Sequence, residues 1–354
     1  MTTQDSPQPV AQRPARWHER LADSLRLRFA DLVETGRRRI ARAPQHDASL
    51  DVLNPPPLVQ DTRLMSRALP AMDERSKLTF GGMTLVTGAL LILAFAIHLF
   101  AISQVYYAKQ QAVLFDDFRY ALANATAPVG QVDQNDRLIV VGSPVALIEI
   151  AKIGLNAVVV EGTSPQAMVS GPGHRRDTPL PGQLGNSVVF GRQFTYGGPF
   201  SGLGNLAKGD KISVVTGQGK HTFVVDRIRY TGDPIPTFSE SGSFLTLVSA
   251  SGIPLMPSSV VRVDAHLTSP AMETPAQMFT VETLGEKEMP MYGDPEAWGL
   301  MALELIVMGI LFLVFWFSAR YWGARQTWIV AVPVGLVFAI ATSVQASLLL
   351  PNLL

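Results

Sequence analysis

Three stretches of this 354-residue chain are apolar over a length that suits a membrane-spanning helix. They predict transmembrane helices over 79–104, 298–319 and 328–350, because about 20 apolar residues are enough to cross a bilayer. Aromatic residues stand at the ends of these stretches, as is typical of side chains that anchor a helix at the membrane interface. The pattern therefore predicts an integral membrane protein.

Between the first and second apolar stretches the pattern changes to short apolar or alternating runs separated by turn residues. Such runs predict strands, here over 157–160, 187–190, 211–215, 221–227, 244–248 and 260–267. We therefore expect a mainly β domain over 131–270. A helical stalk over 105–130 is expected to connect it to the first membrane helix, and a linker over 271–297 to the second.

The region before the first membrane helix, 1–78, is rich in Pro, Arg and Ala and has no continuous core pattern. We expect a partly disordered tail in which 16–42 forms an amphipathic helix, either on anionic lipid or in solvent. Twelve Arg and one Lys precede the first apolar stretch, and the loop 320–327 carries Arg320 and Arg325. The positive-inside rule then places both regions in the cytoplasm and the β domain outside the cell membrane.

Composition narrows the chemistry. The 29 Lys and Arg residues balance the 29 Asp and Glu residues, so no overall charge directs the chain to nucleic acid. The absence of cysteine excludes disulfides and thiolate metal sites. The histidines show no metal-ligand spacing, and the Gly-rich stretch 197–204 lacks the setting of a phosphate-binding loop. We expect neither a metal nor a cofactor.

A series of short sequence words within 147–267 carries a resemblance to a known family. In order, the words are Ile148–Leu155, Glu161–Thr163, Gly171–His174, Leu180–Asn186, Gly191–Gln193, Gly198–Phe200, Lys208–Asp210 and Leu245–Ala250. Their order and spacing resemble the class E sortases, transpeptidases that attach proteins to the actinobacterial cell wall. The resemblance implies a closed, mostly antiparallel β-barrel with a groove over two strands, where His, Cys and Arg meet. An unrelated small β-barrel is the alternative interpretation.

All three positions that the resemblance marks as catalytic are changed in this chain. The family's histidine falls on Arg192, its cysteine on Ala250 and, by an ungapped alignment of the last strand, its arginine on Val260. Arg262, two residues further on, faces the same way and offers a displaced guanidinium. Formation of the acyl-enzyme needs a thiolate, and arginine is no general base near neutral pH. The resemblance therefore implies a catalytically inactive pseudo-sortase.

Several polar residues are candidates for binding in the inherited groove. They are Arg192, Gln193, Arg262, His174, Ser249 and Ser251. Arg192 would make the groove cationic and suited to a carboxylate or an anionic polymer. Ser249 and Ser251 flank Ala250 and are predicted to point away from the groove. His174 is predicted to be a structural loop histidine, because the sequence supplies no clear oriented carboxylate for it.

Polar residues also lie in the outer part of each predicted membrane helix, at similar depth: His98, Glu304 and Gln345. An acidic side chain at such a depth costs a few kcal/mol unless it has a partner. One interpretation is that the three side chains hydrogen-bond to one another and fix the packing of the helices. The other is that each reaches the interface independently.

The function that the sequence favours is a non-catalytic binding or scaffold module at the cell envelope, held by three membrane helices. Its expected partner is a peptide, an active sortase or a larger membrane complex, because many sortases carry a single anchor. One alternative is a serine-dependent peptidase or transpeptidase on the same barrel, which would lack the family's base. A second is a subunit of a membrane transport complex, which rests on the span count and Glu304.

Overall fold

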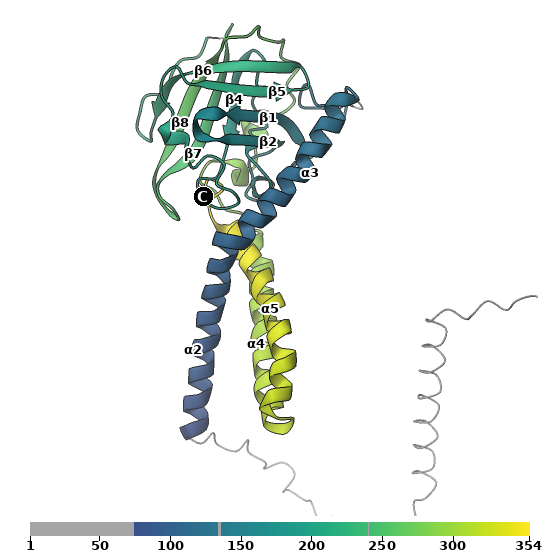
Figure 1. Ribbon diagram of the computed structural model, residues 1–354, viewed down its shortest axis with the longest axis vertical. Helices are drawn as coiled ribbons and strands as arrows, with labels where there is room; N and C mark the ends of the chain where they lie inside the picture. The colour runs from purple at the N-terminus through teal and green to yellow at the C-terminus, as the bar shows by residue number, and fades with distance from the viewer. Residues whose placement is uncertain (1–73, 134–135, 240) are drawn as a thin grey trace, which may run out of the picture. The chain divides into compact units, whose positions relative to one another are not determined.

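A computed structural model describes residues 74–354, apart from 134, 135 and 240. The amphipathic helix expected over 16–42, and nearly all of the predicted tail 1–78, lie outside the described residues. The described part combines long helices with a closed β-barrel (Figure 1).

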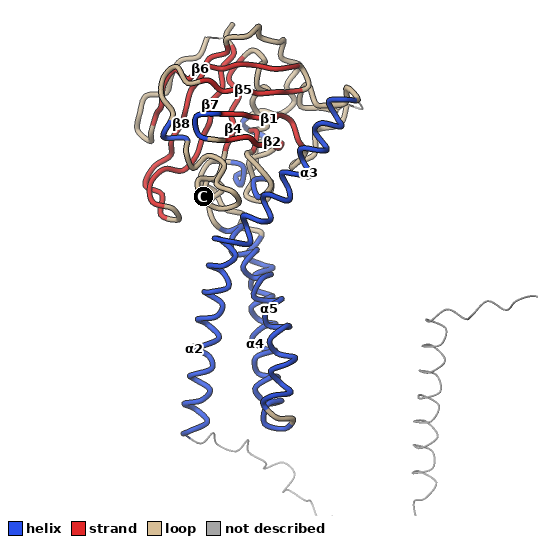
Figure 2. Tube along the Cα trace, in the orientation of Figure 1, coloured by secondary structure: helices blue, strands red, loops and turns tan. Residues whose placement is uncertain are grey.

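All three predicted membrane segments are helices long and apolar enough to cross a membrane. The first begins as α2, Glu74–Ile97, passes through a π-helical turn, His98–Ile102, and continues as α3, Ser103–Ala123. The other two are α4, Ala297–Tyr321, and α5, Ala324–Leu349. The predicted first membrane helix and stalk therefore form one continuous helix, which changes direction at the π-helical turn (Figure 2). Such turns recur at functional positions in helices.

The predicted mainly β domain is confirmed as an eight-stranded closed barrel. Its strands are β1 Pro144–Ile150, β2 Leu155–Glu161, β3 Gly173–His174, β4 Gly185–Phe190, β5 Lys211–Thr216, β6 Gly219–Arg229, β7 Ser243–Ile253 and β8 Met256–Leu267. Around the barrel they follow the order β1-β2-β3-β4-β7-β8-β6-β5. The pairs β2–β3 and β4–β7 are parallel and the others antiparallel. Closure leaves no open sheet edge that a second chain can extend.

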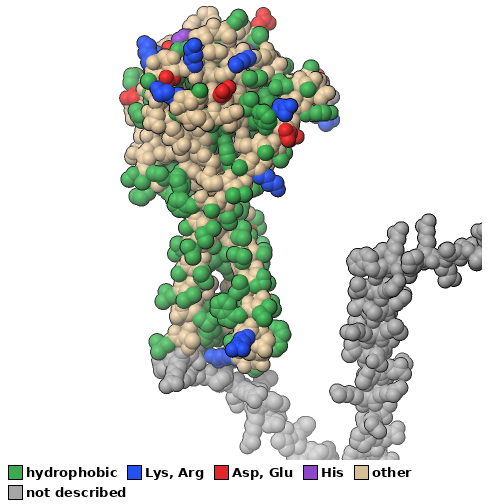
Figure 3. Space-filling view, viewed as in Figure 1, with side chains coloured by type: hydrophobic (Ala, Val, Ile, Leu, Met, Phe, Trp, Pro, Cys, Tyr) green, Lys and Arg blue, Asp and Glu red, His purple; other side chains and the backbone are tan. Residues whose placement is uncertain are grey.

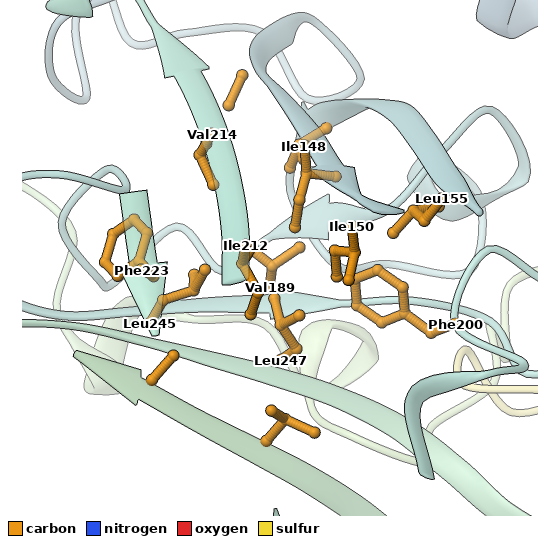
Figure 4. Packing of buried hydrophobic residues seen from close by; sticks show 14 of the residues in the cluster. Ile148, Ile150, Leu155, Val189, Phe200, Ile212, Val214, Phe223, Leu245 and Leu247 are labelled. Atoms are coloured by element: carbon orange, nitrogen blue, oxygen red, sulfur yellow. The ribbon is translucent and has the colours of Figure 1, made fainter. Parts of the chain in front are cut away.

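The interior of the barrel is filled by aliphatic and aromatic side chains from every strand except the short β3 (Figure 4). The labelled members are Ile148, Ile150, Leu155, Val189, Phe200, Ile212, Val214, Phe223, Leu245 and Leu247. Full burial of one such side chain stabilises a fold by roughly 1.5–3 kcal/mol. Since strand side chains alternate, Leu245 and Leu247 inside the barrel put Val248 and Ala250 on its outer face.

The longest strand pair is the β7–β8 hairpin. Its register pairs Ala250 directly with Val260. The two positions that the resemblance assigns to the cysteine and the arginine are therefore cross-strand neighbours on the outer face, with Cβ atoms about 5 Å apart.

Helix α3 is fixed to the barrel by packing and by one glutamine. Leu114 and Phe118 pack against Val158 and Val160 of β2. Gln111 Nε2 donates to the Val158 carbonyl at 3.1 Å, and Gln111 Oε1 accepts from the Val158 amide at 2.7 Å. These contacts satisfy both main-chain groups of an outward-facing position, so the stalk and the barrel form one packed body.

The linker between β8 and α4 also returns to the barrel. Arg176 Nη1 donates to Glu288 Oε1 at 3.2 Å, and the Thr163 hydroxyl donates to the Glu288 carbonyl oxygen at 2.6 Å. The Asp294 amide donates to the carbonyl of Leu348, near the end of α5. The linker therefore contacts both the barrel and the end of α5.

Candidate functional site

The residue at the family's histidine position, Arg192, lies in the loop after β4 and is 1% exposed. Its Nε donates to the Met168 carbonyl at 3.2 Å and its Nη2 to the Pro165 carbonyl at 2.9 Å. Its Nη1 donates to Thr195 Oγ1 at 3.1 Å, and its guanidinium carbon lies 5.0 Å from the centre of the Tyr196 ring. The fork of the guanidinium is thus occupied by the protein's own acceptors and one aromatic ring.

Burial lowers the pKa of Arg192 to about 10, against a smaller opposing influence from Tyr196. The group therefore stays charged at neutral pH and cannot accept a proton from a nucleophile. The expectation that Arg192 offers a cation to a ligand in the groove meets a physical obstacle, because its side chain is enclosed and already hydrogen-bonded. Its role in this structure is to hold the loop after β4.

The surface around Ala250 is covered by a segment that comes directly after α5. Ala250 and Val260 are 2% and 8% exposed. They share a cluster of buried apolar residues with Leu353 and Leu354, which are 0% and 3% exposed. The place where the resemblance expects a nucleophile therefore holds a methyl group under two leucine side chains, with no ionisable atom.

The main chain of this segment is bound by the loop that carries Arg192. The Gln193 amide donates to the Leu353 carbonyl at 2.8 Å. The amides of Phe194 and Thr195 both donate to the main-chain oxygen of Leu354, at 3.1 and 2.7 Å. Three consecutive N–H groups thus bind the main chain of the segment, which itself forms a turn closed by a hydrogen bond from the Leu354 amide to the Pro351 carbonyl at 3.0 Å.

Asn352 fixes the segment from its other side and is fully buried. Its Nδ2 donates to the carbonyls of Thr163, at 2.8 Å, and Met289, at 2.9 Å. Its Oδ1 accepts from the Met291 amide at 2.9 Å. The side-chain amide is satisfied at both ends, so it joins the barrel, the linker and the segment 351–354.

The other groove candidates occupy different surroundings. Gln193 Nε2 donates to the Gly252 carbonyl at 2.9 Å, beside the half-buried Ser251. Arg262 pairs with Val248 in the hairpin and is half-buried. Burial, and next the charge of the neighbouring Arg229, lower the pKa of Arg262. Arg262 is thus on the expected face but lies about 7 Å along the strand from Val260.

Ser249 lies on the opposite face of β7 from Ala250, as predicted, and is fully buried. Its hydroxyl donates to the Gly191 carbonyl at 2.9 Å. A serine nucleophile must instead direct its proton to a base. The bond to Gly191 gives Ser249 a structural use between β4 and β7.

His174 does have an oriented carboxylate, so that part of the sequence interpretation was wrong. Glu161 Oε2 lies 2.9 Å from His174 Nδ1, with both side chains buried. Glu161 ends β2 and His174 ends β3, and the parallel register of these strands puts the two residues opposite each other. The sequence analysis missed this pair because the sequence does not show that β2 and β3 are neighbouring strands.

A Thr178 hydroxyl 3.3 Å from His174 Nε2 completes an arrangement that resembles a catalytic triad. The hydrogen bonds argue against that use. Nε2 also lies 3.0 Å from the Pro179 carbonyl, to which only an N–H can donate. The Thr178 hydroxyl donates to the Arg175 carbonyl at 2.7 Å. Both ring nitrogens face oxygen acceptors, so these partners suit an imidazole that donates from both nitrogens and has a structural role rather than that of a base.

The pKa of His174 is set by its burial and by its contact with Glu161. Burial lowers it, but the charge of Glu161 and the hydrogen bond to it raise it more, so the pKa lies above its ordinary value. His174 and Glu161 line a small pocket together with Gln131, Thr178 and Gln183. In the part of the chain that the structure describes, no three His, Asp or Glu side chains come together to hold a metal ion.

His98, the first residue of the π-helical turn, has a partner that the sequence did not suggest. His98 Nε2 lies 3.3 Å from the Tyr196 hydroxyl, which lies 2.8 Å from Ser347 Oγ. Ser347 Oγ donates to the Val344 carbonyl, so the consistent assignment has Tyr196 donating to Ser347 and His98 donating to Tyr196. This chain connects the π-helical turn, the loop after β4 and α5.

Glu304 and Gln345 are half-buried on α4 and α5. Glu304 Oε2 has no hydrogen-bond partner among the described residues. His98 forms its hydrogen bond with the barrel. The residue directly follows α2, and from this position its side chain reaches the loop after β4. The structure thus gives His98 a use in docking the barrel, whereas the role of the two other residues stays a hypothesis.

Comparison with known proteins agrees with this geometry. Residues 148–250, which run from β1 to the Ala250 position, match the family model of the sortase domain. The chain contains a sortase-family domain. A curated relative, sortase D of Bacillus subtilis (strain 168), is 31% identical over 84 residues, which is 24% of this chain and 41% of that protein. The match thus spans less than half the length of that relative.

The chain is also similar to solved structures of sortases. Sortase E from Streptomyces avermitilis is 32% identical, with 37% of this chain and 91% of that chain covered and a TM-score of 0.32. A sortase D5 transpeptidase from Clostridium perfringens is 21% identical, with 47% and 99% covered and a TM-score of 0.38. The sortase-like barrel occupies less than half of this chain, and the long helices lie outside the 148–250 match.

Two groups of residues at this site were missing from the sequence interpretation. One is the segment Asn352, Leu353 and Leu354. The other consists of Tyr196 and Glu161, two separate residues that each bind a histidine. The only local signal for the segment was two leucines beyond the last membrane helix and the proline at 351. Asn352 lies 189 positions from Thr163 and Tyr196 lies 98 positions from His98, whereas Glu161, only 13 positions from His174, is its neighbour because β2 and β3 pair.

The burial of Arg192 predicts that Arg192→Lys destabilises the protein. Lysine cannot reach three divergent acceptors from one nitrogen, and the loss of two charge-assisted hydrogen bonds costs about 2–4 kcal/mol. Arg227→Lys on the exposed part of β6 is the matched control. Equal unfolding midpoints of the two variants in detergent would contradict the structural role of Arg192.

The buried His174–Glu161 pair predicts a pH dependence of stability. Because the pKa of His174 is raised on folding, its contribution is complete below its unfolded value, about 6.5, and is lost as pH rises through the folded pKa. The thermal midpoint of the full chain should fall over this window, and His174→Gln should flatten that slope. His266→Gln removes the partly exposed His266–Asp226 pair and should leave the slope intact.

Proposed function

We propose that this protein is a membrane-anchored, catalytically inactive sortase-like module that acts as a scaffold or binding protein at the cell envelope. The observation that carries the proposal is the burial of Ala250 and Val260 beneath Leu353 and Leu354. Transpeptidation needs a nucleophile that the substrate can reach. This surface has no nucleophile and is closed by the protein itself.

The proposed location is the cell membrane, with the tail 1–78 and the loop 320–327 in the cytoplasm and the barrel outside. The excess of arginine in both cytoplasmic segments supports this orientation. In this arrangement the proposed domains outside the membrane are a stalk over 105–130, the barrel over 131–270 and a linker over 271–297. Membership of class E, and an actinobacterial origin, are part of the proposal and rest on the sequence words between 148 and 250.

The covered groove bears on the partner. A peptide or a wall polymer that binds where sortases hold their substrate would have to displace Leu353 and Leu354 and break the main-chain bonds to the loop after β4. We therefore favour a protein partner, either an active sortase or a membrane complex, that contacts the outer surface of the barrel or the helices. The three spans are consistent with such an assembly.

The alternative of a serine-dependent peptidase has weaker support. Ser249 is fully buried and donates its proton to a carbonyl, and His174 acts as a double donor to Glu161 and Pro179. The transport alternative retains one observation in its favour, the unpartnered Oε2 atom of Glu304 among the described residues. One carboxylate is not enough to build a proton path.

The proposal is tested by incubating the full chain in nanodiscs with a panel of sorting-signal peptides and following the products by mass spectrometry. We expect no cleavage and no acyl-enzyme from the wild type. Ala250→Cys should be equally silent, because the restored thiol has no base and lies beneath Leu353 and Leu354.

An active class E sortase on the same peptides shows that the panel contains usable substrates. Cleavage by the wild type would overturn the proposal, and Ser249→Ala would then show whether a serine is responsible. Robust activity from Ala250→Cys alone would contradict the account of Arg192 as a structural residue.

A further inference from the structure

The tip of the β7–β8 hairpin is an exposed apolar surface with no charge. Ile253 and Met256 are 72% and 76% exposed, and Pro254 between them is also exposed. No charged residue occurs between Glu240 and Arg262 in the sequence. An exposed cluster of this kind at the end of a projecting strand pair is typical of an interaction surface.

The hairpin projects toward the membrane helices. Its tip lies at the end of the barrel that adjoins α2, α4 and α5. The tip approaches the level at which these helices begin (Figure 1). Hydrophobic side chains gather on the same end of the barrel and continue onto the helices, whereas the visible Lys, Arg, Asp and Glu side chains of the barrel lie further away (Figure 3). The apolar tip therefore lies at the end of the barrel from which the three long apolar helices extend.

Contacts at the base of the hairpin fix this direction. Ala250 and Val260 pack against Leu353 and Leu354, which come soon after the end of α5. The tip lies four to five residues beyond Ala250, or about 13–17 Å along the strands. The hairpin therefore begins at the junction with the membrane helices and extends from it.

The turn at the tip has a conformation that argues for a use of its side chains. Ile253 pairs with Met256, so Pro254 and Leu255 form a two-residue turn. Leu255 has φ = 66°, in the left-handed region that favours Gly or Asn. A branched apolar residue is thus held where the backbone alone favours glycine. Such an outlier is a reason to look for function in the side chain.

We propose that the tip of the β7–β8 hairpin, residues 253–256, inserts into the interfacial layer of the bilayer that holds α2, α4 and α5. The chemistry fits a lipid surface. Ile253, Leu255 and Met256 lose apolar contact with water, and no charge has to be desolvated. Ser258 and Ser259 follow the tip and suit the level of the polar headgroups.

Insertion would give the barrel a lipid contact beside its protein contacts with the stalk and the segment 351–354. Gln193 Nε2 already joins the loop after β4 to Gly252 of the hairpin, so the hairpin is connected to the same loop that binds the segment 351–354. The inference needs only that the three helices span a membrane, and it holds whether or not the barrel is catalytic.

The absence of native cysteine permits a direct test with the full chain in nanodiscs. A nitroxide spin label is attached to Met256→Cys or, as a matched exposed site, to Lys220→Cys. Lys220 follows the β5–β6 turn, whose Gly217 contacts 127 and 128 beyond the far end of α3. Collision rates are measured with oxygen, which concentrates in lipid, and with a water-soluble nickel complex.

We expect the oxygen-to-nickel collision ratio at Met256 to exceed that at Lys220 by about threefold or more, as for a side chain in the interfacial layer. Equal ratios at the two sites would overturn the proposal. A label at Met256 that is accessible to nickel in nanodiscs but protected in native membranes would also overturn it, because a protein partner would then cover the tip.

Discussion

The structure depends on the contact between the loop after β4 and the segment that comes directly after α5. Three consecutive amides, from Gln193 to Thr195, bind the main chain of Leu353 and Leu354, and the two leucine side chains cover Ala250 and Val260. Burial of two leucines stabilises this contact by roughly 3–6 kcal/mol. The same contact connects the barrel to the end of α5, so the covering of Ala250 and the attachment of the barrel to the long apolar helices depend on one set of contacts.

The charged side chain in the loop after β4 has a structural role in this fold. A catalytic base needs one free lone pair, but Arg192 has none and uses its guanidinium to bind two carbonyls, Thr195 and the ring of Tyr196. Tyr196 in turn reaches His98 and Ser347 on the membrane helices. Arg192 thus begins a chain of contacts that extends through Tyr196 to the π-helical turn and α5. These contacts connect the loop after β4 to the long apolar helices.

Much of this architecture could be predicted from the sequence because it depends on local patterns of apolar and polar residues. Apolar length predicted the three long helices, and alternation predicted six of the eight strands. The sequence words placed Ala250 and Val260 together, and their cross-strand pairing agrees with that alignment. What could not be predicted depends on contacts between distant residues. Asn352 binds the Thr163 carbonyl, and Glu161 binds His174 because β2 and β3 are neighbouring strands. Neither contact can be recognised from the sequence before the fold is known. The partner of His98 was missed for the same reason, since Tyr196 is 98 residues away.

The central claim, that the chain closes its own groove, is tested most directly by the alkylation rate of a single thiol at the nucleophile position. In a chain without other cysteines, Ala250→Cys in nanodiscs should react with a small maleimide at least about tenfold more slowly than the exposed Lys220→Cys, because the site is closed unless the segment opens. Adding Leu353→Ala and Leu354→Ala should raise the rate at Ala250→Cys toward that of Lys220→Cys. Equal rates at the two thiols without these added changes would contradict the account.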